Sequence, residues 1–484
     1  TYAPSFFSTY RYREVESRVR VGSSWTTIDT VRLGHKFVAG GASGETVLWL
    51  DTCDRTATGA GSPIVLPTVQ LDSVDSYLAN RADGASDLLK FHRLGRIRDH
   101  FGAEISVGYG RPTPCAGAFP PASGSETWDV NAEDCFPQYW DPPQAPAGFA
   151  VMHKYLVTEV IVRDLIAGAE PEHNRFYYEG EPAWAHNDPP TSNPSLQTWN
   201  DWRGYGEVLT VTGTDDAKSA VESIVFRGMH GDELCCGGSG GTRSVSVYSP
   251  AAGVSFTDQP WLRGQVLQRS DMSFTGGTLS SPIRSEVFRY LADHFASTGS
   301  GPSDPDAARF VAQSRWDEYS YTSSGTKHRY TTTSYNTVRL PEKVVQYGYD
   351  HLSDERCTMT SYDIDGPAYM LDFPDAVFTT PTTNCLGTQS TRVDSIYDGS
   401  GNRTEERVRS QASPAVWSTT TMGYDTLGRV TSVVDPTGVV ATTAYTPTTG
   451  IPASITETQG TGGGALSTVT TSGSPHWWLA STTT

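Results

Sequence analysis

A short phrase recurs from about residue 325 to the end of the chain. Each copy is a strand-like run of Thr, Ser and Val that ends in Tyr and is followed by a polar turn with Gly or Pro. The clearest copy starts at Tyr424, and looser copies start at Tyr335, Tyr362, Tyr397 and Tyr445. These tyrosines are roughly 20 to 35 residues apart, which is the length of two or three strands with their turns. The repeat therefore predicts a series of β-hairpins, each with a tyrosine anchor.

Turn chemistry in the clearest copy explains why each unit folds back on itself. Asp425 can accept hydrogen bonds from the backbone of its own turn, and Gly428 can adopt a positive φ. The strand that follows alternates, so Val430 and Val434 face the same side of it. Residues 435–438 (Asp-Pro-Thr-Gly) form a second turn, in which Pro presets φ. A single hairpin is unstable in water, so we expect the units to pair edge to edge in one long sheet.

The composition of the whole chain also favours an all-β fold. Thr, Ser, Val and Tyr are abundant, and 47 Gly and 30 Pro punctuate the sequence. A formal net charge of -18 without clustered Lys and Arg argues against a nucleic-acid partner. We expect no membrane span, because no run of about 18 apolar residues is present. The chain starts at Thr1 without a signal-peptide pattern, so we expect it to be an interior piece or mature product of a longer polypeptide.

Periodicity divides the chain into two regions. Residues 1–325 form an irregular β region, and residues 326–484 form the hairpin-repeat region. The first region carries two loop insertions, a Pro/Gly/Ser-rich one at 110–148 and one rich in Trp and Pro at 180–200. We take the irregular region as the beginning of the same structure.

Two segments have a local helical pattern. These are residues 85–100 and residues 284–297, and in the second of them Val287, Leu291 and Phe295 recur at steps of four. On this pattern alone we expect helix in both places.

The seven cysteines offer two local pairs, Cys115 with Cys135 and Cys357 with Cys385. In a secreted protein such a bridge stabilises the fold by about 3 kcal/mol, so the pairs indicate export. Three cysteines remain: Cys53, Cys235 and Cys236. Either Cys235 or Cys236 could bond Cys53, which would leave one unpaired thiol. We expect no zinc site, because neither CxxC nor paired-His spacing accompanies the cysteines.

Candidate catalytic patterns are weak. Residues 237–241 (Gly-Gly-Ser-Gly-Gly) fit the G-x-S-x-G pattern, but the strand before and helix after that a nucleophile elbow needs are not evident. A glycine loop is the preferred interpretation. Two pairs of acids could catalyse glycoside hydrolysis: Glu405 with Glu406, and Asp232 with Glu233. We prefer the interpretation that both pairs are solvated surface charges. We expect a chain that is not an enzyme and that has no catalytic residue, cofactor or metal ligand.

Large aromatic residues gather in and beside the two insertions, at Tyr139, Trp140, Trp184, Trp199 and Trp202. They could form a stacking platform for sugars, or they could be buried in the β fold, and burial is the more frequent outcome for large aromatics. His153 stands at the head of a strand, and we expect it to be a structural hydrogen-bonding residue.

The Tyr-Asp-x-x-Gly-Arg phrase of residues 424–429 resembles the YD repeats of RHS proteins, a group that includes bacterial polymorphic toxins and teneurin relatives. Pieces of the first region resemble RHS-repeat proteins of actinobacteria: residues 48–50, 80–84, 135–137, 153–155, 202–206 and 227–229. The resemblance implies a large secreted polypeptide whose strands wind in a spiral into a hollow shell, often around a C-terminal toxin segment.

The resemblance to RHS proteins also bears on the interpretation of two segments, residues 435–438 and residues 284–297. RHS proteins carry an aspartate autoprotease with a DPxG-type sequence and a second Asp shortly after it. Residues 435–438 match the first half, but residues 439–445 contain no Asp, so we interpret them as a repeat turn and not as a protease site. Resembling proteins continue in strand-like sequence at residues 284–297, which argues against helix there.

Our main hypothesis is a structural one. The chain is a segment of a secreted or surface-exposed bacterial β-shell, and its partner is an effector or toxin segment of the same polypeptide. The alternative is a cell-surface adhesin or carbohydrate-binding module that binds glycans through the Trp-rich middle region.

Overall fold

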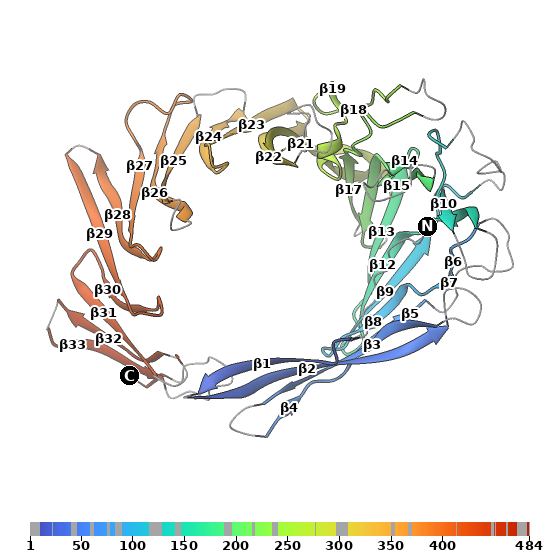
Figure 1. Ribbon diagram of the computed structural model, residues 1–484. Coiled ribbons are helices and arrows are strands. Elements are labelled where there is room, and N and C mark those ends of the chain that lie inside the picture. The colour runs from blue at the N-terminus through green and yellow to red at the C-terminus, as the bar shows by residue number, and fades with distance from the viewer. Residues whose placement is uncertain are drawn as a thin grey trace.

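The protein is described by a computed structural model (Figure 1). The structure describes residues 10–483 apart from residues 22, 40–45, 59–61, 75–77, 83–89, 116–127, 141–146, 188–195, 215–217, 235–240, 276, 297–307, 350–353, 366–369, 413, 447–449, 451, 461–462 and 472–481. The regular structure in these residues is almost entirely β, with one 3-10 turn, η3 (Pro260–Leu262). None of the described segments is a helix long and apolar enough to cross a bilayer.

One antiparallel sheet of 26 strands runs through the molecule and confirms the all-β prediction. The short strand β4 pairs with β3, which also pairs with β5, and every other strand pairs with the next strand of the sheet in chain order, so the sheet is a meander. Its first half contains β1 (Glu14–Val21), β2 (Ser24–Ala39), β3 (Thr46–Ala57), β4 (Ile64–Val65), β5 (Val69–Ser73), β8 (Leu94–Arg98), β9 (Ala103–Gly110), β12 (Leu156–Asp164), β13 (Glu172–Glu179), β16 (Glu207–Thr212), β17 (Ser219–Val225), β20 (Val266–Thr275) and β21 (Thr278–Ala296).

The second half of the sheet continues without a break in the pairing. The hairpin between β22 and β23 turns at residues 323–324, close to where the sequence becomes periodic. Figure 1 shows the whole sheet curving round in a wide arc. The second half contains β22 (Ala308–Thr322), β23 (Gly325–Tyr335), β24 (Pro341–Tyr347), β25 (Arg356–Asp365), β26 (Met370–Thr380), β27 (Thr391–Tyr397), β28 (Arg403–Ala412), β29 (Ala415–Tyr424), β30 (Val430–Val434), β31 (Val439–Tyr445), β32 (Pro452–Gln459), β33 (Ala465–Thr471) and β34 (Thr482–Thr483).

Four small hairpins are inserted between strands of the first half. They follow β5, β9, β13 and β17, which run in the same direction because each is separated from the next by one antiparallel strand. All four insertions therefore leave the sheet at the same rim. Their strands are β6 (Leu78–Ala79) with β7 (Lys90–Phe91), β10 (Cys135–Trp140) with β11 (Gly148–His153), β14 (Ala183–Asn187) with β15 (Thr198–Gly204), and β18 (Ser246–Ser249) with β19 (Val254–Thr257).

Both local helix predictions are wrong in the described residues. Residues 284–296 belong to β21 and pair with β20 on one side and β22 on the other. A step of four residues is also two full periods of a strand, so the recurrence of Val287 and Leu291 fits one face of a strand equally well. Within 85–100, residues 90–91 form β7 and residues 94–98 form β8, and residues 85–89 lie outside the described residues.

Buried apolar side chains are concentrated where the insertions meet the sheet. The largest cluster joins β17, η3, β20 and β21 through Ile224, Phe226, Leu262, Leu267 and Val287. Among the described residues, the buried apolar side chains other than Val345 and Cys357 lie before residue 290. The later hairpins form a single layer without a second sheet among the described residues, so most of their side chains are only half-buried.

Candidate functional site

The five tyrosines predicted as repeat anchors lie on alternate strands: β23, β25, β27, β29 and β31. Each hydroxyl donates a hydrogen bond to a backbone carbonyl oxygen of the strand before it. These bonds join Tyr335 to Gln313 (2.8 Å), Tyr362 to Pro341 (2.9 Å), Tyr397 to Pro374 (3.2 Å), Tyr424 to Arg403 (2.8 Å) and Tyr445 to Val430 (2.7 Å).

Each acceptor is the residue that pairs in the sheet with the preceding tyrosine. Arg403 pairs with Tyr397 and accepts the bond from Tyr424, and Pro374 pairs with Tyr362 and accepts the bond from Tyr397. The pairing shifts register immediately before every one of the five tyrosines, which marks a β-bulge. A bulge disrupts the regular backbone hydrogen bonds, and the hydroxyl of the next tyrosine donates a hydrogen bond to a backbone carbonyl at the bulge. We call this linked series the tyrosine ladder.

Three tyrosines of the first region make the same contact, and the sequence analysis missed them. Tyr290 donates to the carbonyl of Val266, and Tyr290 itself pairs with Gln313, the acceptor of Tyr335. Further upstream, Tyr178 donates to the carbonyl of Val157 (2.8 Å), and Tyr109 donates to the carbonyl of Leu94 (2.9 Å). Tyr109 itself pairs with Val157 in the sheet. Each of these tyrosines lies near the end of a strand, as the predicted anchors do, but their irregular spacing in the sequence made the pattern hard to recognise.

Burial keeps several of these hydroxyls in the donor form. It raises the pKa of Tyr109, Tyr178, Tyr290, Tyr335 and Tyr362 above the usual value. A phenol with a raised pKa stays protonated at neutral pH and can donate its hydrogen. These tyrosines therefore remain available as hydrogen-bond donors.

The turns beside the ladder have the predicted chemistry. The Oδ1 atom of Asp425 accepts hydrogen bonds from the backbone N–H groups of Leu427 (2.9 Å) and Arg429 (3.0 Å), and Gly428 has φ of 75°. Asp435 makes the equivalent bonds to the N–H groups of Thr437 and Val439. The carboxylate of Asp435 is thus a turn cap within the Asp-Pro-Thr-Gly segment.

The four inserted hairpins pack on one another in what we call the insertion layer, which consists of the described residues within 74–93, 111–155, 180–206 and 226–265. The first and second insertions are joined by a bond from the N–H of Ala82 to the carbonyl of Val151 (2.9 Å). The indole of Trp184 donates to the carbonyl of Glu133 (2.9 Å), which joins the third insertion to the second. Figure 1 shows β10, β14 and β15 together on one side of the arc.

Aromatic side chains form the core of this layer. Trp128, Trp184 and Trp199 pack together with relative exposures of 5%, 2% and 6%, and Phe136 and Trp202 pack against them. An indole so deeply buried offers no ring face to a sugar. The remaining candidates for a platform are also engaged, since Tyr139 stacks edge-on against Phe149 and the guanidinium of Arg81 covers Trp140.

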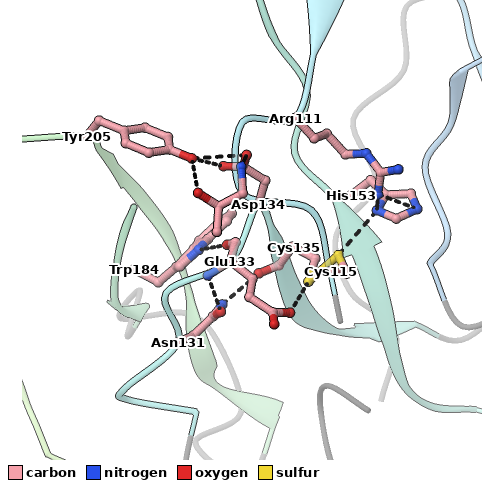
Figure 2. Close-up of a disulfide and its surroundings, with 10 residues drawn as sticks. Arg111, Cys115, Asn131, Glu133, Asp134, Cys135, His153, Trp184 and Tyr205 are labelled. Atoms are coloured by element: carbon pink, nitrogen blue, oxygen red, sulfur yellow. Dashed lines mark hydrogen bonds between the residues drawn. A yellow bond between two sulfur atoms is a disulfide. The ribbon is translucent and has the colours of Figure 1, made fainter. Parts of the chain in front are cut away.

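A buried carboxylate joins the second insertion to the rest of the layer (Figure 2). The carboxylate of Asp134 accepts hydrogen bonds from the N–H of Thr113 (2.8 Å) and the hydroxyl of Tyr205 (3.0 Å). Burial raises the pKa of Asp134, although both hydrogen bonds act in the opposite direction. Burial also raises the pKa of Tyr205, so this hydroxyl remains a donor. No local sequence pattern identified Asp134 or Tyr205.

The first predicted disulfide lies beside Asp134. It joins Cys115 to Cys135, with a Cα–Cα distance of 5.9 Å. The Sγ atom of Cys115 lies 3.4 Å from Nδ1 of His153, and the Arg111 guanidinium lies 2.6 Å from the same nitrogen (Figure 2). Burial and the neighbouring cations of Arg111 and Arg93 lower the pKa of His153 to about 4, so its imidazole is neutral at neutral pH.

The second predicted disulfide lies in the hairpin-repeat region. It joins the buried Cys357 of β25 to Cys385 in the connection after β26, with a Cα–Cα distance of 5.3 Å. Cys53 is a free thiol. Cys235 and Cys236 lie outside the described residues, as does most of the glycine run at 237–241.

Each acid of the two predicted pairs lies against a basic side chain. Glu405 and Glu406 are consecutive in β28, so they point to opposite faces of the strand, and their ion-pair partners are Arg407 and Arg403. The carboxylate of Asp232 bonds the Arg243 guanidinium (2.9 Å), and that of Glu233 lies 3.4 Å from His186. Each of these acids therefore has a structural partner.

Comparison with known proteins gives a limited result. No family model matches the sequence, and no curated protein matches it. A crystal structure of TcdB2–TccC3–Cdc42 is similar with a TM-score of 0.42 and 13% identity, over 88% of this chain and 28% of that chain. A crystal structure of TcdB2–TccC3 is similar with a TM-score of 0.41 and 11% identity, over 92% of this chain and 32% of that chain. This chain spans about a third or less of the length of either.

Proposed function

We propose that this chain is a structural segment of a secreted RHS-repeat protein, in which it forms part of a β-shell that encloses or displays a C-terminal effector or toxin segment of the same polypeptide. The tyrosine ladder is the observation that carries the proposal. It links repeat to repeat along one continuous sheet, and the repeat phrase at Tyr424 resembles the YD repeats of shell-forming RHS proteins.

The physical properties of the sheet suit the wall of an enclosure. A single layer of strands has two usable faces, and the arc in Figure 1 gives the wall a concave side. Antiparallel pairing covers both edges of most strands, and among the described strands open edges remain at β1, at the short β4 and at the last strands of the sheet. Pairing edges of this kind are where further repeats of a longer polypeptide can continue the sheet.

The two disulfides support an extracellular or cell-surface location for this segment. Disulfides at Cys115–Cys135 and Cys357–Cys385 persist in oxidising compartments and are rare in the bacterial cytosol. The proposal gives the chain no catalytic residue or cofactor. We do not retain the glycan-binding alternative, because Trp184 and Trp199, which it needs exposed, are in the core of the insertion layer.

Site-specific proteolysis of the longer polypeptide tests the proposal. One protease recognition sequence is placed beside Leu427, whose side chain is exposed in a turn, and a second is placed in the downstream segment. Enclosure predicts cleavage at the turn while the downstream site resists until the shell is denatured, together with hollow particles in electron micrographs. Equal cleavage at both sites, with no hollow particle, would contradict the shell.

A further inference from the structure

Strand β1 has one open edge. Among the described strands it pairs with β2 alone. The N–H of Leu33 donates to the carbonyl of Arg13 (2.8 Å), so the backbone groups of the odd-numbered residues of β1 point toward β2. The backbone groups of the even-numbered residues within 14–20 point the other way. β1 therefore presents a row of hydrogen-bonding groups to a strand that lies beside it.

The side chains of β1 carry a charge sequence that is complementary to itself. Glu14 and Glu16 are followed by Arg18 and Arg20, and all four lie on one face of the strand because they alternate with the odd-numbered residues. Glu14 forms an ion pair with Arg32 (2.7 Å). Arg20 is exposed and forms no ion pair with a described residue. The basic end of the strand can therefore accept an acid from outside the chain.

Two copies of β1 can pair antiparallel about a twofold axis at Ser17. Glu14 of one copy then lies opposite Arg20 of the second copy, and the reverse contact repeats it across the axis. Glu16 and Arg18 are opposed in the same way. Because the opposed residues are even-numbered in both copies, their free backbone groups point at each other and can form a regular antiparallel ladder. A parallel alignment in register would instead oppose like charges.

The apolar side chains of this segment fit the same register. Val15 is 53% exposed and would lie opposite Val19 of the second copy, on the other face of the sheet. Tyr12 is 80% exposed and precedes Glu14 on the charged face. It would lie diagonal to Arg20 of the second copy, within reach of a cation–π contact. The pairing therefore covers exposed apolar groups on both faces.

Charge on an edge strand also protects many proteins from aggregation. Charge of one sign serves that purpose, because it repels a second copy in every orientation. β1 instead places two acids before two arginines, which opposes like charges in the parallel orientation and opposite charges in the antiparallel one. The order of the charges thus selects one partner and one orientation.

We propose that β1 is an interface between two copies of this chain, which pair antiparallel at Ser17 and continue one sheet across a twofold axis. The occupant is a second copy because the charge sequence of β1 complements its own reverse. This interface goes beyond the shell function. Each copy keeps its own arc, and the last strands of the sheet stay available for further repeats.

Charge reversal on β1 tests the interface by sedimentation velocity over a range of concentrations. One variant has an all-acidic strand (Arg18→Glu with Arg20→Glu), and the other has an all-basic strand (Glu14→Arg with Glu16→Arg). The wild type is expected to form dimers. Each variant alone is expected to dimerise about 10- to 100-fold more weakly, because every charged pair becomes repulsive. An equimolar mixture of the two variants is expected to restore the dimer, since acids again oppose arginines.

A wild type that stays monomeric would overturn the proposal, as would a mixture that associates no better than the separate variants. Far-UV circular dichroism checks that both variants are folded. None of these results bears on the shell, which the proteolysis of the longer polypeptide tests separately.

Cysteine cross-linking tests the register. Ser17→Cys places two thiols opposite each other at the axis, where Cα atoms of directly opposed residues are about 4.5 Å apart and a disulfide can form. Val15→Cys is the matched control, because its counterpart lies at least about 13 Å away along the strand. Mild oxidation is expected to give a covalent dimer of Ser17→Cys, with Val15→Cys at the background of the wild type, which contains the Cys53 thiol. Equal yields from the two variants would exclude this register.

Discussion

The hydroxyl of Tyr424 donates a hydrogen bond to the carbonyl oxygen of Arg403, 2.8 Å away. Arg403 stands opposite Tyr397, directly after the bulge in the pairing of β27 with β28. Each tyrosine of the ladder thus donates a hydrogen bond to the strand at the β-bulge that lies beside the previous tyrosine. The repeat is held by a contact that needs two copies, which explains why an isolated hairpin of this kind would not be stable.

Removing one hydroxyl of the ladder measures the strength of this link. Tyr424→Phe keeps the ring and deletes the hydrogen bond to Arg403, so the free energy of unfolding is expected to fall by about 1 kcal/mol. Urea unfolding followed by circular dichroism gives the value. Tyr248→Phe, in β18 outside the ladder, is the matched control. An equal loss in both variants would mean that the ladder bond contributes nothing of its own.

Alanine substitutions at two glycines in the turns beside the ladder are expected to have opposite effects on stability. Gly428 has φ of 75°, a conformation that L residues with a side chain rarely adopt, so Gly428→Ala is expected to destabilise by about 1 kcal/mol. Gly399 lies in the equivalent turn, has no positive φ and has open space where a Cβ would be added. Gly399→Ala is expected to be neutral or to stabilise by about 0.5 kcal/mol. Thermal unfolding of both variants checks the order.

Local chemistry was predictable from the sequence. The turn bonds of Asp425 and the positive φ of Gly428 involve residues within four positions of each other, so they depend on little beyond the segment itself. The error at residues 284–297 came from a period that fits both helix and strand. Pairing with β20 and β22 decided in favour of the strand, and pairing is not visible in a local window.

Long-range contacts account for what the sequence did not reveal. The acceptor of each ladder tyrosine depends on the register of the neighbouring strand, as with Arg403 for Tyr424. The burial of Asp134 depends on Tyr205, which is 71 residues away in the chain. The convergence of Glu133 and His153 on the Cys115–Cys135 pair likewise requires β10 and β11 to be paired.

The disulfide between Cys357 and Cys385 is expected to stabilise the hairpin-repeat region. The bond spans a sequence separation of 28 and restricts the unfolded chain. Replacing both cysteines by Ala is expected to lower the free energy of unfolding by about 3 to 4 kcal/mol in urea without a reductant. Hydrogen exchange followed by mass spectrometry locates the effect, which is expected in β25 and β26 and not in β10 and β11. Faster exchange in both places would point to a general loss of folding.

Glu318 and Asp134 have opposite effects on stability as the pH falls. Burial alone would raise the pKa of Glu318, but hydrogen bonds from Arg329, Tyr349 and Arg284 outweigh it and lower this pKa to about 2. The stability from Glu318 is therefore present above about pH 4.5 and is lost as the pH falls toward 2. Asp134 has a raised pKa, so its contribution is greatest below its unfolded value and is lost as the pH rises through the folded one.

Two amide substitutions separate these contributions. The free energy of unfolding is measured from about pH 6 to about pH 3 for the wild type, Glu318→Gln and Asp134→Asn. Glu318→Gln is expected to be less stable at neutral pH, because it leaves Arg284 and Arg329 without the opposing charge of Glu318, so the readout for both variants is the change with pH. Glu318→Gln is expected to lose less stability than the wild type on acidification, and Asp134→Asn is expected to lose more. Parallel curves for the three proteins would show that neither carboxylate titrates differently in the folded and unfolded chains.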